Sequence, residues 1–111
     1  MVDRDHGRLF VYGALLDSKV RGRLLGRELP GERARLLGYE RGHQRYYFVA
    51  RRESASVPGE ILSQLLPDDL AVLDQYEAVP ILYTRESTEV QNASGALVRC
   101  WIYLPTGWEQ G

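Results

Sequence analysis

Apolar positions in the first quarter of the chain form one short continuous run, followed by a helix-spaced segment. The run at residues 9–12 is typical of a strand that is buried on both faces, and Gly13 ends it. Asp17 or Ser18 can then cap a helix that continues to about Leu25. This part of the sequence therefore predicts a buried strand and a short helix.

Further along the chain, five segments combine apolar and aromatic residues in patterns typical of strands: 33–41, 44–52, 57–65, 83–90 and 96–105. The polar segment 51–56 is expected to form a turn between the second and third of them. The last two strands are expected to form a hairpin through residues 91–95. The clearest helix is predicted at residues 66–78, because Pro67 and the two aspartates after it suit a first helical turn.

These elements give the order strand, helix, three strands, helix, two strands. Such an order favours a mixed α/β domain, of the α+β class, that is dominated by a curled sheet. The chain has 111 residues, which is enough for one hydrophobic core and too few for two. We therefore expect a single domain over residues 1–111.

Charge is divided unevenly along the chain, although the net charge is only −1. Residues 19–52 hold ten Lys/Arg and three Glu (+7), whereas residues 53–111 hold two Arg and nine Asp/Glu (−7). A basic block beside aromatic residues leaves nucleic-acid binding open as one interpretation. The arginines are spread over a predicted helix and two strands, which favours a solvated, salt-bridging surface. We expect folding to bring the opposite charges of the two halves together.

Composition argues against a membrane-spanning segment, an intramolecular disulfide and a metal site. No apolar run approaches the roughly 20 residues that span a bilayer, and the N-terminal residues lack a signal core, so we expect a cytoplasmic protein with no membrane partner. Cys100 is the single cysteine and is expected to be a small buried residue. His6 and His43 have no partner at metal-ligand spacing, so no metal site is expected.

One carboxylate falls on the apolar side of the second predicted helix. Leu66, Leu70, Leu73 and Glu77 follow one another at steps of four, three and four, which trace one helix face. A helix C-terminus disfavours an anion by about 0.3–1 kcal/mol. Either the helix frays and Glu77 reaches solvent, or the carboxylate lies in a partly desolvated pocket, where a raised pKa lets it accept and return a proton.

A second candidate feature is the glycine in "VYGALL". Gly13 directly follows the predicted strand, where the backbone can approach a ligand closely and neighbouring amides can point outward as donors. An ordinary tight turn is the alternative. The chain has neither GxxxxGK[ST] nor GxGxxG, so nucleotide binding has little support.

Four segments, in their order along the chain, resemble the γ-glutamylcyclotransferase-like superfamily and in particular its AIG2-like and γ-glutamylamine cyclotransferase branch. They are "FVYGALL", "VPGEIL", "LDQYEAVPILYTRESTEV" and "CWIYLP". The resemblance covers residues 8–105, nearly the whole chain. No single motif is decisive, and it is the four in sequence that are specific.

The resemblance implies a small mixed β-barrel flanked by short helices, with the substrate in a cavity at the barrel mouth. It places the catalytic acid/base at Glu77. It assigns Tyr83 to the cavity lining, although an ordinary barrel-facing aromatic is the alternative. Arg85 is expected to pair either with an acidic residue in a structural salt bridge or with a carboxylate of the substrate. The resemblance assigns the binding of the glutamyl end to the backbone of the glycine turn: Tyr12, Gly13, Ala14 and Leu15.

The implied reaction cyclises the γ-glutamyl group of a small γ-glutamyl amine or peptide to 5-oxoproline and releases the free amine, without a metal or cofactor. Ala14 stands where the family commonly has Ser or Thr, and Ala78 where it often has Gly. These departures leave the preferred amine and the activity itself open. The alternative is a non-enzymatic module of the same fold that binds a small metabolite or a partner.

Overall fold

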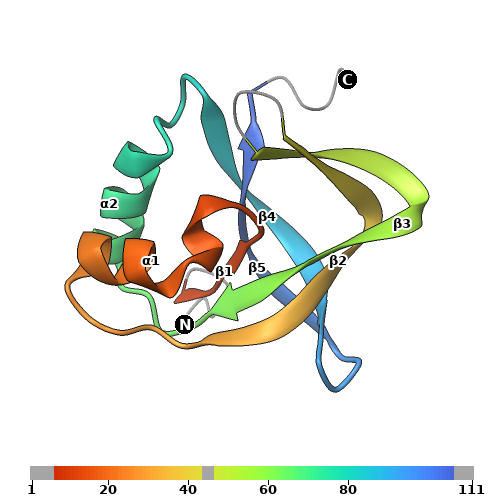
Figure 1. The fold of residues 1–111 in the computed structure, drawn as a ribbon, viewed down its shortest axis with the longest axis horizontal. Coiled ribbons are helices and arrows are strands. Elements are labelled where there is room, and N and C mark those ends of the chain that lie inside the picture. The colour runs from red at the N-terminus through yellow and green to blue at the C-terminus, as the bar shows by residue number, and fades with distance from the viewer. Residues whose placement is uncertain (1–6, 44–46, 107–111) are drawn as a thin grey trace.

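The computed structural model describes residues 7–43 and 47–106, and its strands close into a barrel in the order β1-β3-β2-β4-β5. Both helices lie on one side of the barrel, and the long β2–β3 hairpin extends on the other (Figure 1). The elements are β1 (Leu9–Val11), the 3-10 turn η2 (Ala14–Leu16), α1 (Ser18–Leu25), β2 (Gly31–His43), β3 (Tyr47–Leu62), α2 (Pro67–Tyr76), β4 (Tyr83–Asn92) and β5 (Leu97–Pro105). The predicted α+β class with a small barrel and short flanking helices is confirmed.

The barrel is mixed because one of its strand pairs is parallel. β1 pairs in parallel with β5, where Phe10 lies opposite Ile102, and in the antiparallel sense with β3. The remaining pairs, β2 with β3, β2 with β4 and β4 with β5, are antiparallel. Closing the sheet on itself leaves each strand with neighbours on both sides, which removes the exposed edges of an open sheet.

The continuous apolar run of β1 follows from burial on both faces. Phe10 and Tyr12 belong to the core inside the barrel, whereas Leu9 and Val11 belong to the layer between the barrel and the helices. A strand covered on both faces needs no polar positions. The end of β1 therefore lies where the barrel interior and the helical layer meet.

The prediction of two strands separated by a turn at 51–56 is wrong, because β3 is one long strand that pairs with β2. The pairing shifts between Leu37 and Tyr39, where Gly38 has a φ of +84°. On β3 the paired residues pass from Arg51 to Ser56 at that point, so the polar segment forms an irregular bend inside the strand. Residues 44–46 of the predicted strand 44–52 lie outside the described residues.

The predicted helices are confirmed, but α2 begins one residue later and ends two residues earlier than the predicted 66–78. The Asp17 side chain accepts a hydrogen bond from the Lys19 amide (2.9 Å) and caps α1. In α2, Leu70 and Leu73 are buried in the layer against the barrel, but Leu66 is exposed. Leu66 lies at the N-cap with an extended backbone, so it does not continue the helical apolar stripe.

The opposite charges of the two halves meet, as expected, and not only at the surface. Arg27, two residues after α1, forms an ion pair with Asp69 of α2 at 2.5 Å, and Arg21 of α1 pairs with Glu60 of β3 at 3.2 Å. Arg21 is only 3% exposed, so the prediction of a solvated arginine surface is wrong for this residue.

Cys100 is buried, as predicted. Within residues 7–43 and 47–106, no helix is long and apolar enough to cross a membrane.

Candidate active site

A cavity of about 410 Å³ lies between the end of β1, the C-terminal end of α2 and the start of β4. All six residues that were predicted for the site line it: Tyr12, Gly13, Ala14, Leu15, Glu77 and Tyr83. The remaining lining residues were not predicted: Phe10, Val11, Tyr47, Tyr76, Leu82 and Tyr103. Segments that lie far apart in the sequence therefore form one pocket.

Glu77 caps the C-terminus of α2 and is half-buried in the cavity wall. Its amide donates to the Leu73 carbonyl (2.9 Å), and the chain leaves the helix through Ala78 at a φ of +55°. The helix thus ends at Tyr76, but the Glu77 side chain is not fully solvated. Desolvation by the cavity walls raises its pKa from 4.5 to about 7. A carboxyl group with this pKa can both accept and donate a proton near neutral pH.

Hydrogen bonds fix the tyrosines around Glu77. The Tyr12 hydroxyl donates to the Tyr103 carbonyl (2.6 Å), and the Tyr83 hydroxyl donates to the Tyr47 carbonyl. Burial raises the pKa of Tyr12 and Tyr103 above the ordinary value of 10, so both phenols stay neutral. Glu77 carries the one carboxyl group among the described lining residues.

Asp74 anchors the C-terminal turn of α2 to the barrel. Its carboxylate accepts hydrogen bonds from Arg85 Nε (2.8 Å) and Nη2 (3.1 Å) and from the Tyr103 hydroxyl (2.6 Å). The Arg85 guanidinium also lies 4.4 Å from the centre of the Trp101 ring. Arg85 therefore forms the structural salt bridge that was one of its two predicted roles, and the pair fixes the backbone three residues before Glu77.

The turn at residues 13–16 is fixed by its neighbours, and its residues Gly13, Ala14 and Leu15 line the cavity. A Cβ on Gly13 would lie 2.9 Å from the Cβ of Tyr47, so a larger residue would displace that ring. Buried Arg21 donates through Nη1 to the carbonyls of Leu15 (3.1 Å) and Leu16 (3.2 Å). Among the described residues, no acceptor takes the amides of positions 13–15, which leaves these donors for a ligand.

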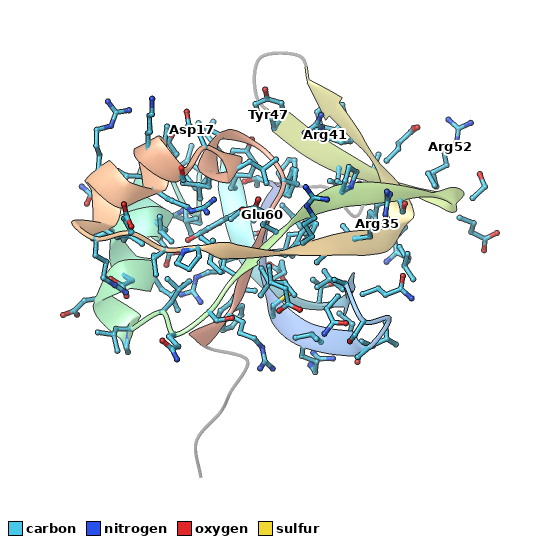
Figure 2. The ribbon with its side chains drawn as sticks, turned by 60° about the horizontal axis from the view of Figure 1, so that its bottom comes forward. Asp17, Arg35, Arg41, Tyr47, Arg52 and Glu60 are labelled. Carbon is cyan, nitrogen blue, oxygen red and sulfur yellow. The ribbon has the colours of Figure 1, made fainter. Side chains whose placement is uncertain are left out.

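Arg41 connects the β2–β3 hairpin to this turn. Its Nη1 donates to the Tyr12 carbonyl (3.0 Å), and its guanidinium lies 5.5 Å from the centre of the Tyr47 ring. Figure 2 shows Arg41 and Tyr47 close together on the hairpin, beside the turn. No local pattern could have indicated Tyr47 or Arg41, because both reach the site through long-range strand pairing. In the described part of the chain, no three His, Cys, Asp or Glu side chains are grouped to hold a metal ion.

Replacing Glu77 with Gln is expected to change stability in a pH-dependent way. The folded pKa of Glu77 exceeds its ordinary value, so its contribution to stability is fully present below pH 4.5 and is lost as the pH rises to about 7. Gln carries no charge to desolvate. The free energy of unfolding of Glu77→Gln should therefore be about 1–3 kcal/mol higher than that of wild type at high pH. At low pH the two values should be equal.

Urea unfolding of both proteins at about pH 4 and about pH 8 measures this difference. If the variant and wild type differed in free energy of unfolding by the same amount at both pH values, this result would contradict the burial of the ionised carboxylate.

Comparison with known proteins gives a family match and a set of similar folds. Residues 9–110 match the family described as gamma-glutamyl cyclotransferase, AIG2-like. A Methanocaldococcus jannaschii protein, named as a gamma-glutamylcyclotransferase with a proposed RNase activity, is 28% identical over 99 residues. These residues are 86% of this chain and 45% of the relative, so the chain spans about half the relative's length.

Solved structures with the same fold include proteins of a plant and of a mouse. An Arabidopsis thaliana protein superposes with a TM-score of 0.81 at 24% identity, over 98% of this chain and 67% of its own. An AIG2-like protein of Mus musculus gives a TM-score of 0.70 at 24% identity, over 89% of this chain and 77% of its own. A protein titled gamma-glutamyl cyclotransferase gives a TM-score of 0.80 at 17% identity, over 92% of this chain and 68% of its own. At these identities, the likeness shows the fold.

Proposed function

The chain belongs to the AIG2-like gamma-glutamyl cyclotransferase family, and we propose that it converts a small γ-glutamyl amine or peptide to 5-oxoproline and a free amine. One observation carries the proposal. The half-buried Glu77 carboxyl, with a pKa of about 7, shares a cavity with the glycine turn, whose amides at positions 13–15 have no acceptor among the described residues. The carboxyl group can transfer protons, and the amides can bind a negatively charged oxygen.

The substrate supplies its own nucleophile. In a γ-glutamyl amide, the α-amine can reach the γ-carbonyl carbon and close a five-membered ring, so the enzyme gains most by holding the folded substrate in place. The Glu77 carboxylate takes a proton from the α-ammonium, and the free amine then attacks. The new C–N bond forms as the γ-carbonyl oxygen becomes an oxyanion.

Collapse of this intermediate completes the reaction. The oxyanion re-forms the carbonyl, the bond from the γ-carbon to the leaving nitrogen breaks, and the leaving nitrogen receives the proton that Glu77 holds. The ring nitrogen still carries one extra proton after the attack, and Glu77 takes this proton and passes it to the released amine. The products are 5-oxoproline with a single lactam N–H and an ammonium ion, and Glu77 is again a carboxylate, so the atoms and protons balance without a metal or cofactor. Amides of Gly13, Ala14 and Leu15 hold the glutamyl end and stabilise the oxyanion. The Ala14 side chain has no hydroxyl, but a backbone amide does not depend on the side chain.

The proposal is tested by incubating the protein with γ-glutamyl-ε-lysine, γ-glutamyl amino acids, glutathione and γ-glutamyl amides of small amines. We expect 5-oxoproline and free amine to appear in equal amounts for at least one of them. A folded protein that binds a γ-glutamyl compound but releases no 5-oxoproline would contradict the enzymatic function and favour the binding-module alternative.

A further inference from the structure

A second groove of the structure shares no lining residue with the cavity that contains Glu77. It encloses about 670 Å³ and is lined by residues of β2, of β3 and of the turn between β4 and β5. Its described lining holds three arginines, Arg33, Arg35 and Arg41, and a single carboxylate, Glu60. Figure 2 shows Glu60 toward the helices and Arg35 further out along the two long strands. The groove therefore carries an excess of positive charge.

No carboxylate of the described chain neutralises the three arginines. Arg35 donates through Nη1 to the Ser56 hydroxyl (3.0 Å), and Arg41 donates to the Tyr12 carbonyl (3.0 Å), so both acceptors are uncharged. Arg33 has no hydrogen-bond or ion-pair partner in the part of the chain that the structure describes. Like charges at one surface repel one another, and a bound anion would relieve this repulsion.

The Glu60 carboxylate is engaged elsewhere. Arg33 lies directly opposite Glu60 in the β2–β3 register, yet Glu60 Oε1 pairs with buried Arg21 at 3.2 Å. Arg21 is fixed in turn by the carbonyls of the helical layer to which it donates. Since Glu60 has this cationic partner of its own, it does not compensate the charge of the three arginines in the groove.

The turn between β4 and β5 adds neutral donors to the groove through Gln91 and Asn92. The Asn92 Oδ1 accepts hydrogen bonds from the amides of Ser94 (3.1 Å) and Ala96 (2.9 Å). Because these amides fix the position of the oxygen, the other end of the Asn92 carboxamide is a donor, and it has no acceptor among the described residues. Guanidinium and carboxamide donors together match an anion with many acceptor oxygens.

The spacing of the arginines matches more than one anionic group. Arg33 and Arg35 are two residues apart on β2, so their side chains leave the same face of the strand about 6–7 Å apart. Linked phosphates concentrate several negative charges over a short distance. No aromatic side chain is among the described lining residues, so the bases of a single-stranded nucleic acid would have no ring to stack on.

We propose that this groove binds a chain of linked phosphate groups, either a free polyphosphate or the phosphate tail of a nucleotide, through Arg33, Arg35 and Arg41. The chain has neither glycine-rich phosphate-binding motif, so recognition rests on arginine side chains. The proposal does not depend on the cyclotransferase function, because the two sites share no lining residue.

Calorimetric titration with tripolyphosphate, ATP and orthophosphate tests the proposal. We expect one tripolyphosphate or ATP to bind per chain, at least about tenfold more tightly than orthophosphate, and more weakly as salt is raised. Whichever of the first two binds more tightly identifies the source of the phosphate chain. Absence of binding of both at millimolar concentration, equal affinity for orthophosphate, or tighter binding of a short oligouridylate would overturn the proposal.

Two double variants with the same loss of charge locate the site. Arg33→Gln with Arg35→Gln should weaken tripolyphosphate binding at least about tenfold, because two charge-assisted contacts are lost. Arg23→Gln with Arg99→Gln is the matched control, since Arg23 and Arg99 are exposed and lie outside the described lining of the groove. Arg99, like Arg35, donates to a serine hydroxyl. Equal weakening in both double variants would show that net charge alone attracts the anion, and would overturn the assignment.

A carboxylate added to the groove wall gives a test that removes no side-chain contact. Ala93 lines the groove and is exposed, so Ala93→Glu should weaken tripolyphosphate binding by about three- to tenfold through repulsion. Arg99→Gln alone changes the net charge by the same amount outside the groove. Unchanged binding by Ala93→Glu, or the same loss in both variants, would contradict the proposed site.

Discussion

Replacing Glu77 with Gln is expected to lower kcat by about 10²–10⁴-fold, the usual contribution of a positioned acid or base. Gln retains the size of the side chain and a hydrogen-bonding oxygen, but it cannot take the proton of the α-ammonium or return one to the leaving nitrogen. Substrate affinity should change little, because the amides of the glycine turn remain. The measurement is 5-oxoproline release under saturating substrate, with affinity followed by calorimetry on the slow variant.

Glu86→Gln is the matched control for charge removal, since Glu86 is exposed on β4 and outside the cavity lining. It should turn over substrate at the wild-type rate. Near-wild-type turnover by Glu77→Gln would exclude Glu77 as the acid/base, whatever the control shows.

Replacing Arg21 with Met is expected to lower the free energy of unfolding by about 2–4 kcal/mol. Arg21 donates to the carbonyls of Leu29 (2.9 Å), Leu15 and Leu16 and to Glu60 (3.2 Å). Met can fill the volume but leaves these acceptors without their donor. Since the turn that carries the free amides is held by two of these bonds, KM should also rise. Denaturant unfolding and steady-state kinetics measure the two effects.

Arg52→Met provides the comparison for Arg21→Met. Arg52 pairs with Glu40 at 3.0 Å, but both side chains are largely exposed, and Figure 2 shows Arg52 on the outer bend of the hairpin, away from Glu60. Loss of an exposed pair of this kind costs less than about 1 kcal/mol. Equal destabilisation by the two substitutions would mean that the buried Arg21 network contributes no more than a surface ion pair.

Local patterns predicted those parts of the site that depend on neighbours in the sequence. Glu77 follows Leu70 and Leu73 at helical spacing, and its placement on the cavity side follows from that spacing. Gly13 follows a buried strand, and the turn that it opens lies in the same cavity. Local signals indicated these two residues because one helix or one turn positions each of them. They left open whether Glu77 reaches solvent and whether Gly13 is an ordinary turn, and it was the family resemblance that assigned both to a substrate cavity.

Parts of the site that depend on long-range pairing could not be predicted in this way. Tyr47 packs against Gly13 only because β3 runs unbroken beside β2, and the polar composition of the bend wrongly indicated a turn. Arg21 looks like any solvent-facing arginine of a short helix. Its burial depends on Glu60 and the Leu29 carbonyl, which become its neighbours only when α1 packs onto the barrel.

The pH dependence of kcat/KM for 5-oxoproline release tests the central claim most directly. This quantity reports the ionisation of the free enzyme, in which Glu77 has a pKa of about 7 and must be a carboxylate to accept the first proton. We predict that kcat/KM rises about tenfold per pH unit below this pKa and levels off near it. A profile that is flat between about pH 5 and about pH 8, or that levels off near the ordinary carboxyl pKa, would contradict the account.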